Sequence, residues 1–269
     1  MQPRLDSHAL NSHGSKNVIK PSGSSRRENT YDLILLALIF GDLAPGSAVD
    51  EKQLARDFSI GLAGVRAALY RLSLEGLVER QPRIGTRIPD LGLRELQEVF
   101  EARVLIEGDC AALCAVRASL EELATMRSAF DGYADAIRAR DFRGLVRMDQ
   151  LFHRTMAVAC RNTLIQKQVI VLHNNASRFW YFGLPRLQPA VLYADIDMHL
   201  KVVDAMKRRD ASAAKLAMSA VLGHFPDNVR DFLNGPISLT EVNANVRSAV
   251  DRRKRKRPQK RARATGNVS

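Results

Sequence analysis

The chain has 269 residues, 46% of them hydrophobic, and a formal net charge of +12 at pH 7. This length allows one large domain or two smaller ones with real hydrophobic cores. The longest apolar run, Leu33 to Phe40, is far shorter than the ~20 residues of a membrane span. The N-terminal region also has no hydrophobic stretch typical of a secretory signal. We therefore expect neither membrane insertion nor classical secretion.

The three cysteines, Cys110, Cys114 and Cys160, are too few and too odd in number for a disulfide framework. We expect them to be free thiols that pack as small apolar side chains. This cysteine usage favours the reducing cytoplasm.

The positive charge is concentrated at the two ends of the chain. Residues 1–28 contain five Lys or Arg against two acidic residues, and residues 247–269 contain ten against one. Residues 29–246 are therefore neutral overall, so the net charge alone is weak evidence that the folded part binds nucleic acid. Neither end shows hydrophobic periodicity. We expect residues 1–28 to be disordered and residues 236–269 to form a disordered basic tail.

The segment 29–90 has the element order of a winged helix-turn-helix domain. Helical spacing of apolar residues recurs three times, with a loop rich in Gly, Pro and Ser after the first helix. The period then changes to that of two short strands joined by a tight turn. In chain order we predict helices at residues 31–40, 50–58 and 65–72 and a hairpin at residues 76–90 with Gly85 at its tip.

From residue 91 to residue 235 the chain shows helical periodicity throughout. This pattern predicts a second, all-α domain of about six helices. A long helix opens at Leu93 and runs past Leu113. The later predicted helices cover residues 120–138, 141–159, 162–182, 187–208 and 211–233.

Particular residues of the first domain make it similar to a known family. The segment from Leu33 to Asp90 resembles the DNA-binding domain of GntR-family transcription regulators. The residues that carry this resemblance are Gly41, Pro45-Gly46, Leu54-Ala55, Val65-Arg66, Ala68-Leu69, Leu72 and Glu75-Gly76-Leu77-Val78. Downstream, residues 98–115, 149–153 with Asn162, and 199–218 resemble the all-α ligand-binding domain called FCD in the FadR-type branch. The resemblance implies a mainly α protein with an N-terminal winged helix-turn-helix and an FCD-like helical bundle.

The first domain offers candidate contacts to double-stranded DNA. A recognition helix places its N-terminal residues in the major groove, where an Arg can pair with guanine through two hydrogen bonds, so Arg66 is the leading candidate. The alternative is that Arg66 is a surface cation in an intradomain ion pair. Lys52 is placed to meet phosphate, and the hairpin forms either a basic wing or an ordinary solvated turn. The candidate DNA-binding residues are Lys52, Arg66, Arg83, Gly85, Thr86 and Arg87.

The start of the recognition helix departs from the family pattern. Relatives have a Ser-Arg-Thr-Pro-like stretch, whereas this chain has residues Gly61-Leu62-Ala63-Gly64. Gly61 is a tolerable N-cap, but Gly64 inside the first turn costs up to about 1 kcal/mol relative to Ala. We expect an altered operator, or weakened DNA binding that the basic tail offsets.

The second domain contains candidate metal ligands. Asp149 and His153 are four residues apart, so they share one helical face, and His199 lies in a later segment. Such a pair is often a simple surface interaction, but the FCD resemblance places both segments around a cavity. The donor types indicate Zn, Ni, Mn or Fe rather than Ca or Mg. Where the family has a further His this chain has Val221, and His224 follows three residues later as a candidate fourth ligand.

Two arginines in otherwise apolar helices are candidates for binding an effector. In the family such cavities hold small carboxylates, and the planar fork of Arg103 or Arg178 suits a carboxylate. The alternative for Arg103 is an ion pair with Glu107. His173 lacks a partner at helical spacing and is assigned a structural role.

Together these features predict a metabolite-responsive transcription regulator, a repressor that binds its DNA operator as a homodimer. An organic acid bound beside the metal would alter the spacing of two winged helices. The first alternative is a metal-dependent hydrolase, which would have no use for a winged helix and for which no general base stands out. The second is a DNA-binding protein without sequence preference. We expect a regulator without enzymatic activity.

Overall fold

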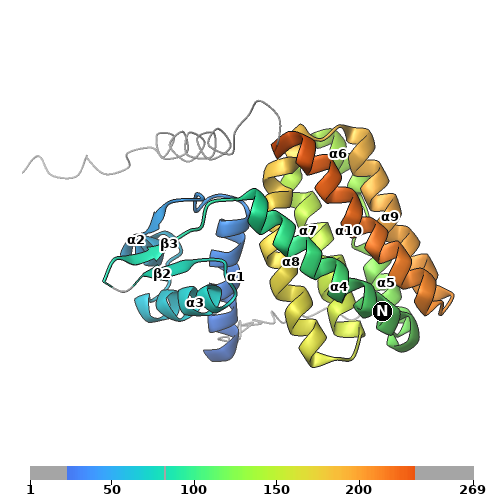
Figure 1. Ribbon diagram of the computed structural model, residues 1–269. Coiled ribbons are helices and arrows are strands. Elements are labelled where there is room, and N and C mark those ends of the chain that lie inside the picture. Colours follow the sequence, from blue (N-terminus) through green and yellow to red (C-terminus); the bar gives the residue numbers. More distant parts are fainter. Residues whose placement is uncertain (1–22, 82, 234–269) are drawn as a thin grey trace, which may run out of the picture.

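The structure is a computed structural model that describes the backbone of residues 23–81 and 83–233 and the side chains of residues 30–81 and 83–223. It has an N-terminal lobe of helices and a small sheet, followed by a helical lobe (Figure 1). The predicted mainly α fold, a winged helix-turn-helix before an all-α bundle, is confirmed. Most of the N-terminal segment, residues 1–22, and the basic tail at residues 236–269 lie outside the described residues.

The N-terminal lobe packs helices around one core and pairs short strands at its edge. Ile34, Leu69, Leu72 and Leu77 are almost fully buried in this core. Strand β3 is the middle strand and pairs antiparallel with both β1 and β2. The elements are α1 (Gly23–Ile39), β1 (Ala48–Val49), α2 (Glu51–Asp57), α3 (Leu62–Leu74), β2 (Glu79–Gln81) and β3 (Gly85–Arg87).

The first helix begins earlier than the sequence predicts. Helix α1 starts at Gly23, inside the segment 1–28 that we predicted to be disordered. Among the described side chains of this helix, Thr30 and Tyr31 are buried. The sequence of residues 23–29 is polar apart from one glycine, so it adds no apolar periodicity to the helix. A search for hydrophobic spacing therefore cannot detect these residues.

Local chemistry explains where the helices of the helix-turn-helix begin. The carboxylate of Asp50 accepts hydrogen bonds from the backbone N–H groups of Lys52 and Gln53, both at 2.9 Å, and so caps α2. Helix α3 begins at Leu62, and its N-cap residue Gly61 contributes no side-chain hydrogen bond. Its end is marked by Gly76, whose φ of +76° is a conformation that favours glycine.

The C-terminal lobe is a bundle in which α10 packs along α4 (Figure 1). Phe152, Met156, Val202 and Met218 are fully buried in its core. The predicted helix over residues 120–138 is in fact two helices, because the chain turns at residues 129–132, where Gly132 has a φ of +79°. The elements are α4 (Leu93–Arg117), α5 (Leu120–Ser128), α6 (Tyr133–Ala139), α7 (Phe142–Ala159), α8 (Thr163–Gly183), a 3-10 turn η1 (Leu184–Arg186), α9 (Pro189–Lys207) and α10 (Ala211–Leu233).

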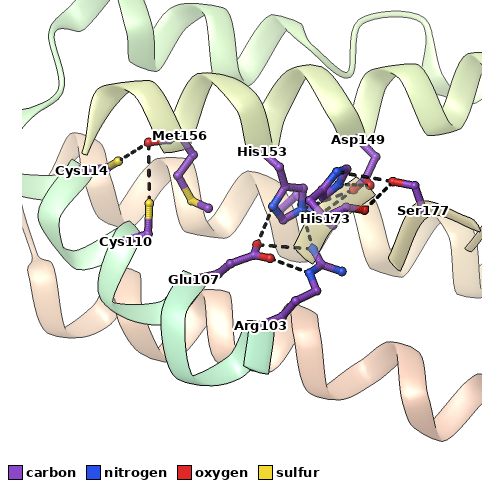
Figure 2. Close-up of polar contacts among 10 residues, drawn as sticks. Arg103, Glu107, Cys110, Cys114, Asp149, His153, Met156, His173 and Ser177 are labelled. Atoms are coloured by element: carbon purple, nitrogen blue, oxygen red, sulfur yellow. Dashed lines mark hydrogen bonds and ion pairs between the residues drawn. The ribbon is translucent and has the colours of Figure 1, made fainter. Parts of the chain in front are cut away.

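The three cysteines are free and buried, as predicted. Cys110 and Cys114 on α4 both direct their thiols to the carbonyl oxygen of Met156 on α7, at 3.8 and 2.9 Å (Figure 2). Burial contributes to raising the pKa of Cys160 to about 11. Cys160, like Cys110, whose pKa is also raised, is therefore a protonated packing group rather than a nucleophile. Among the described residues, no helix combines the length and apolar character of a membrane-spanning segment.

Candidate functional site

Helix α3 presents one face to the core and the opposite face to solvent. Its buried residues are Val65, Ala68, Leu69 and Leu72. A stripe of its exposed residues, at helical spacing, comprises Ala63, Arg66, Ala67, Tyr70 and Leu74, and Arg71 beside it is exposed as well. Tyr70 is 53% exposed, and the guanidinium of Arg80 lies 5.7 Å from its ring centre. An exposed stripe on the second helix of a helix-turn-helix is the surface that enters a major groove.

Arg66 lies in the middle of this stripe. Its side chain is 60% exposed, and its Nε lies 2.8 Å from Oε2 of Glu51 on α2. The ion pair that the sequence left as an alternative is therefore present. An exposed pair of this kind contributes only about 0–1 kcal/mol, so it leaves the guanidinium free to exchange Glu51 for a base edge.

The hairpin displays basic side chains around a strained turn. Arg83 has a φ of +66° and Gly85 a φ of +125°, and both residues are exposed. Arg87 is exposed and pairs with Asp90 at 2.7 Å. Ile84 at the tip is 82% exposed, a feature that sequence patterning gave no reason to select.

The structure contradicts the prediction that the side chain of Thr86 contacts DNA. Thr86 is only 5% exposed, because side chains of β3 alternate and its position faces the core. Lys52 is exposed in the first turn of α2, so it remains a candidate phosphate contact.

In the helical lobe, three potential metal-binding atoms from two helices lie close together. His153 Nε2 and His199 Nε2 are 3.4 Å apart. Asp149 Oδ1 lies 3.5 Å from the first and 3.4 Å from the second. Helix α7 supplies Asp149 and His153 one turn apart, and α9 supplies His199. The three predicted ligands are thus brought together, and among the described side chains they form the group able to hold a metal ion.

Each of the two histidine ligands contacts a further oxygen atom through its other ring nitrogen. Nδ1 of His153 lies 2.7 Å from Oε2 of Glu107, and Nδ1 of His199 lies 2.8 Å from the carbonyl oxygen of Asp195. Figure 2 shows Glu107 between His153 and Arg103. Carbonyl or carboxylate partners of this type fix the tautomer of a metal-binding histidine, so that Nε2 presents its lone pair to the ion.

Charge neutralisation keeps the carboxylates of the site ionised. Burial alone would raise the pKa of Glu107, but Arg103 and His153 outweigh burial and lower it to about 2. Burial would likewise raise the pKa of Asp149, yet His153 and His173 hold it well below its usual range. Asp149 is therefore a ready ligand for a cation at neutral pH.

The histidines of the site differ in their proton affinity. Burial, assisted by the nearby His153, lowers the pKa of His173 to about 4. Burial would also lower the pKa of His199, but Asp195 and Asp149 outweigh it and raise this pKa to about 9. His173 is thus neutral at pH 7, whereas His199 is protonated until a metal ion replaces its proton.

A small cavity adjoins the donor atoms. Its volume is about 30 Å³, and α4, α7, α8, α9 and α10 all contribute to its wall. Arg103 lines the cavity while its Nε bonds Glu107 at 2.5 Å, so the ion pair that we considered as an alternative is present. Val221 lines the cavity and offers no donor atom. The side chain of His224 lies outside the described residues, and its role as a ligand stays a prediction.

Arg178 does not line this cavity, contrary to the prediction that it faces an effector. It is fully buried, its Nη2 donates to the carbonyl oxygen of Pro89 at 2.8 Å, and its Nη1 lies 3.7 Å from Glu95. The reason is helical geometry, since Arg178 is rotated by about 140° around α8 from the cavity-facing His173.

His173, which the sequence assigned a structural role, is part of the site. Its Nε2 lies 2.8 Å from Oδ2 of Asp149 (Figure 2). The contact joins α8 to α7, and no fixed spacing along the chain signals it. The one signal in the sequence was the occurrence of His and Ser at positions 173 and 177 of one helical face.

The fold and site define a winged-helix DNA-binding domain joined to a helical domain with a candidate metal site, and the comparisons agree with the two-domain architecture. Residues 26–88 match the family model described as bacterial regulatory proteins, gntR family, and residues 98–224 match the FCD domain model. The chain belongs to the GntR family of transcription regulators, in the group with an FCD domain.

Individual relatives are distant but cover most of the chain. The chain is 24% identical over 200 residues to the uncharacterized HTH-type transcriptional regulator YdhC of Bacillus subtilis, covering 72% of this chain and 85% of the relative. It is 20% identical over 203 residues to the HTH-type transcriptional repressor RspR of Escherichia coli, covering 76% and 88%. The solved structure of E. coli McbR/YncC matches with a TM-score of 0.70 and 19% identity over 78% of this chain and 99% of that one.

Proposed function

We propose that the protein is a repressor that binds a specific operator as a homodimer under the control of a metal-containing pocket. The observation that carries this proposal is the exposed stripe of α3 with Arg66 at its centre, beside a basic wing. Arg66 reads a guanine in the major groove, and Arg83 and Arg87 contact the backbone or minor groove. The relative RspR is a transcriptional repressor, which supports repression. We also propose a cytoplasmic location, where the operator DNA lies.

A homodimer is supported by apolar side chains on the outer face of the helical domain. Leu105 and Val116 on α4 are 75% and 68% exposed, and Leu216 on the adjoining α10 is 71% exposed. Exposed apolar side chains on two packed helices favour an interface with a second copy. Two copies joined here would place two recognition helices on a palindromic site.

The three donor atoms suit a tetrahedral metal ion. Two ligands at about 2.0–2.1 Å from one tetrahedral zinc are about 3.3–3.4 Å apart, whereas octahedral neighbours would be about 2.8–3.0 Å apart. The observed separations of 3.4, 3.5 and 3.4 Å are compatible with a tetrahedral ion such as zinc. Asp149, His153 and His199 would hold the ion. A bound zinc would supply a Lewis-acidic position open to water or to an oxygen of the effector.

A small carboxylate is the effector that this pocket suits best. Arg103 lines the pocket, and its Nη2 lies 3.5 Å from His153 Nε2, so one carboxylate would meet both a guanidinium and the metal position. The cavity of about 30 Å³ accommodates an ion with bound water rather than an organic acid. Binding the effector therefore requires the surrounding helices to move apart.

Helix α8 supplies a route from this movement to the DNA-binding domain. His173 and Ser177 face the pocket, while Asn175 and Arg178 hold residues of the other domain. Displacement of α8 would move the end of α3 and the segment before α4 together. The orientation of the two winged helices would then depend on what occupies the pocket.

The test is selection from a pool of randomised duplexes. The wild type should enrich a palindromic site, and Arg66→Ala should weaken binding to it by about 1–3 kcal/mol and flatten the sequence preference. Arg56→Ala is the matched control, because Arg56 is exposed on α2 and its guanidinium donates a hydrogen bond to Gln53 of the same helix. Equal preference in wild type and Arg66→Ala, or no enriched site, would sink the proposal.

A further inference from the structure

His173 contacts a different oxygen of Asp149 than the two histidine ligands do. Asp149 turns Oδ1 toward His153 and His199, and its other oxygen, Oδ2, lies 2.8 Å from Nε2 of His173. The carboxylate is therefore held from two sides by different partners. His173 is 2% exposed, so water does not compete for this contact.

The chemistry of the pair determines where the proton lies. An ionised carboxylate only accepts hydrogen bonds, so Nε2 of His173 carries the hydrogen and donates it to Asp149. The hydroxyl of Ser177 donates to the backbone oxygen of His173 at 2.8 Å and lies 3.4 Å from Nδ1 of the ring. Nε2 of His173 is thus already used as a donor and has no lone pair for an ion.

The other two ligands have equivalent partners behind them. Glu107 supports His153, and the carbonyl oxygen of Asp195 supports His199. His173 completes this outer set on the side of Asp149. Because Val221 offers no donor atom, the described residues supply three ligands, and metal affinity depends on the correct orientation of each of them.

We propose that His173 is a positioning residue of the metal site, which holds Asp149 in the orientation that directs Oδ1 to the ion without binding the ion itself. This inference rests on the proposed metal site. Outer partners of this kind typically change metal affinity 10- to 100-fold when they are removed.

The experiment measures zinc affinity by competition with a chromophoric chelator in the wild type, His173→Ala and His173→Gln. We expect about a 10- to 100-fold loss in the Ala variant and partial recovery in the Gln variant, whose amide N–H can donate to Asp149. Asn175→Ala is the matched control. It also removes a buried polar side chain from α8, but the amide of Asn175 bonds Glu75 and Val171 rather than the pocket. Its zinc affinity should equal that of the wild type.

The visible spectrum of the Co²⁺-loaded protein separates a positioning role from direct ligation. At saturating Co²⁺ the spectrum of His173→Ala should keep the band positions and intensities of the wild type. A spectrum that reports the loss of a nitrogen ligand would overturn the proposal, as would unchanged zinc affinity in His173→Ala. If the wild type itself bound no zinc, the proposed metal site would fail as well, an outcome distinct from failure of the role of His173 alone. Should the Ala variant not fold, unchanged zinc affinity in the folded His173→Phe variant, which also lacks a donor, would equally contradict it.

Discussion

The side-chain amide of Asn175 on α8 donates a hydrogen bond to the carbonyl oxygen of Glu75, 3.0 Å away at the end of the recognition helix α3. Asn175 is two residues from His173, which lines the proposed metal pocket within the helical domain. Two residues along a helix correspond to a rotation of about 200°, so α8 presents opposite faces to the two domains. A single rigid helix thus contacts both the pocket and the DNA-reading element.

This relationship predicts the effect of Asn175→Ala. Without DNA, zinc affinity should be unchanged, but the change of DNA affinity that zinc causes in the wild type should shrink, because the amide no longer ties α8 to α3. Titrations of labelled operator with the protein, with and without zinc, measure both quantities. A zinc effect as large as that of the wild type would show that α8 transmits nothing through Asn175.

The weak start of the recognition helix predicts that Gly64→Ala stabilises the protein. A Cβ at position 64 would lie 3.7 Å from the nearest atoms of Thr30, which is ordinary van der Waals contact. The gain should be up to about 1 kcal/mol, because Ala is a better helix former than Gly. Gly76→Ala is the matched contrast. Its φ of +76° should make the same substitution destabilising by about 1–2 kcal/mol. Denaturant unfolding of both variants checks the two opposite signs.

The pKa of His199 predicts how zinc binding depends on pH. In the metal-free protein, Asp195 and Asp149 raise this pKa to about 9 against the effect of burial. Zinc binds the neutral imidazole, so below pH 9 the ion displaces one proton. The zinc affinity should therefore rise by about tenfold for each pH unit as the pH increases to 9, and level off above it. Asp195→Asn removes one source of the raised pKa and should move the plateau to lower pH. Competition titrations between pH 7 and pH 9 give the slope, and a flat profile would contradict the protonated state of His199.

The basic tail, which lies outside the described residues, predicts a salt effect. Ten Lys or Arg against one acidic residue in 247–269 should contact phosphates without regard to sequence. Each phosphate neutralised should steepen the slope of log K against log salt by about 0.9. The comparison is between the full chain and a chain that ends at residue 246, on operator and on random duplex. Equal slopes would mean that the tail does not touch DNA.

Hydrophobic spacing predicted most of the helices because burial fixes the period of apolar residues. It located α3 through Val65, Ala68, Leu69 and Leu72, and the five long helices of the second domain to within a few residues. It missed strand β1, because two residues are too few to display a period. It also predicted α5 and α6 as one helix. The left-handed turn at Gly132 ends the first helix, but the apolar pattern continues through it.

The candidate site was predictable only where one helix carried the signal. Asp149 and His153 share a face of α7, so their spacing in the sequence predicted that they are neighbours. His173 and Glu107 reach the same centre from α8 and α4, and only the packing of the bundle brings them there. Arg178 was assigned to the wrong side of α8 because composition does not reveal which face of a largely buried helix meets which neighbour.

The most direct test measures the affinity of the selected operator for the wild type and for the His153→Ala, His199→Ala double variant, each metal-free and loaded with zinc. The account predicts that zinc changes the apparent Kd of the wild type by about fivefold or more, the usual range of coupling between two sites. The double variant, which lacks two of the three ligands, should show one Kd in both conditions. An identical Kd for the wild type with and without zinc, while zinc is bound at one per chain, would contradict control of DNA binding by this metal centre.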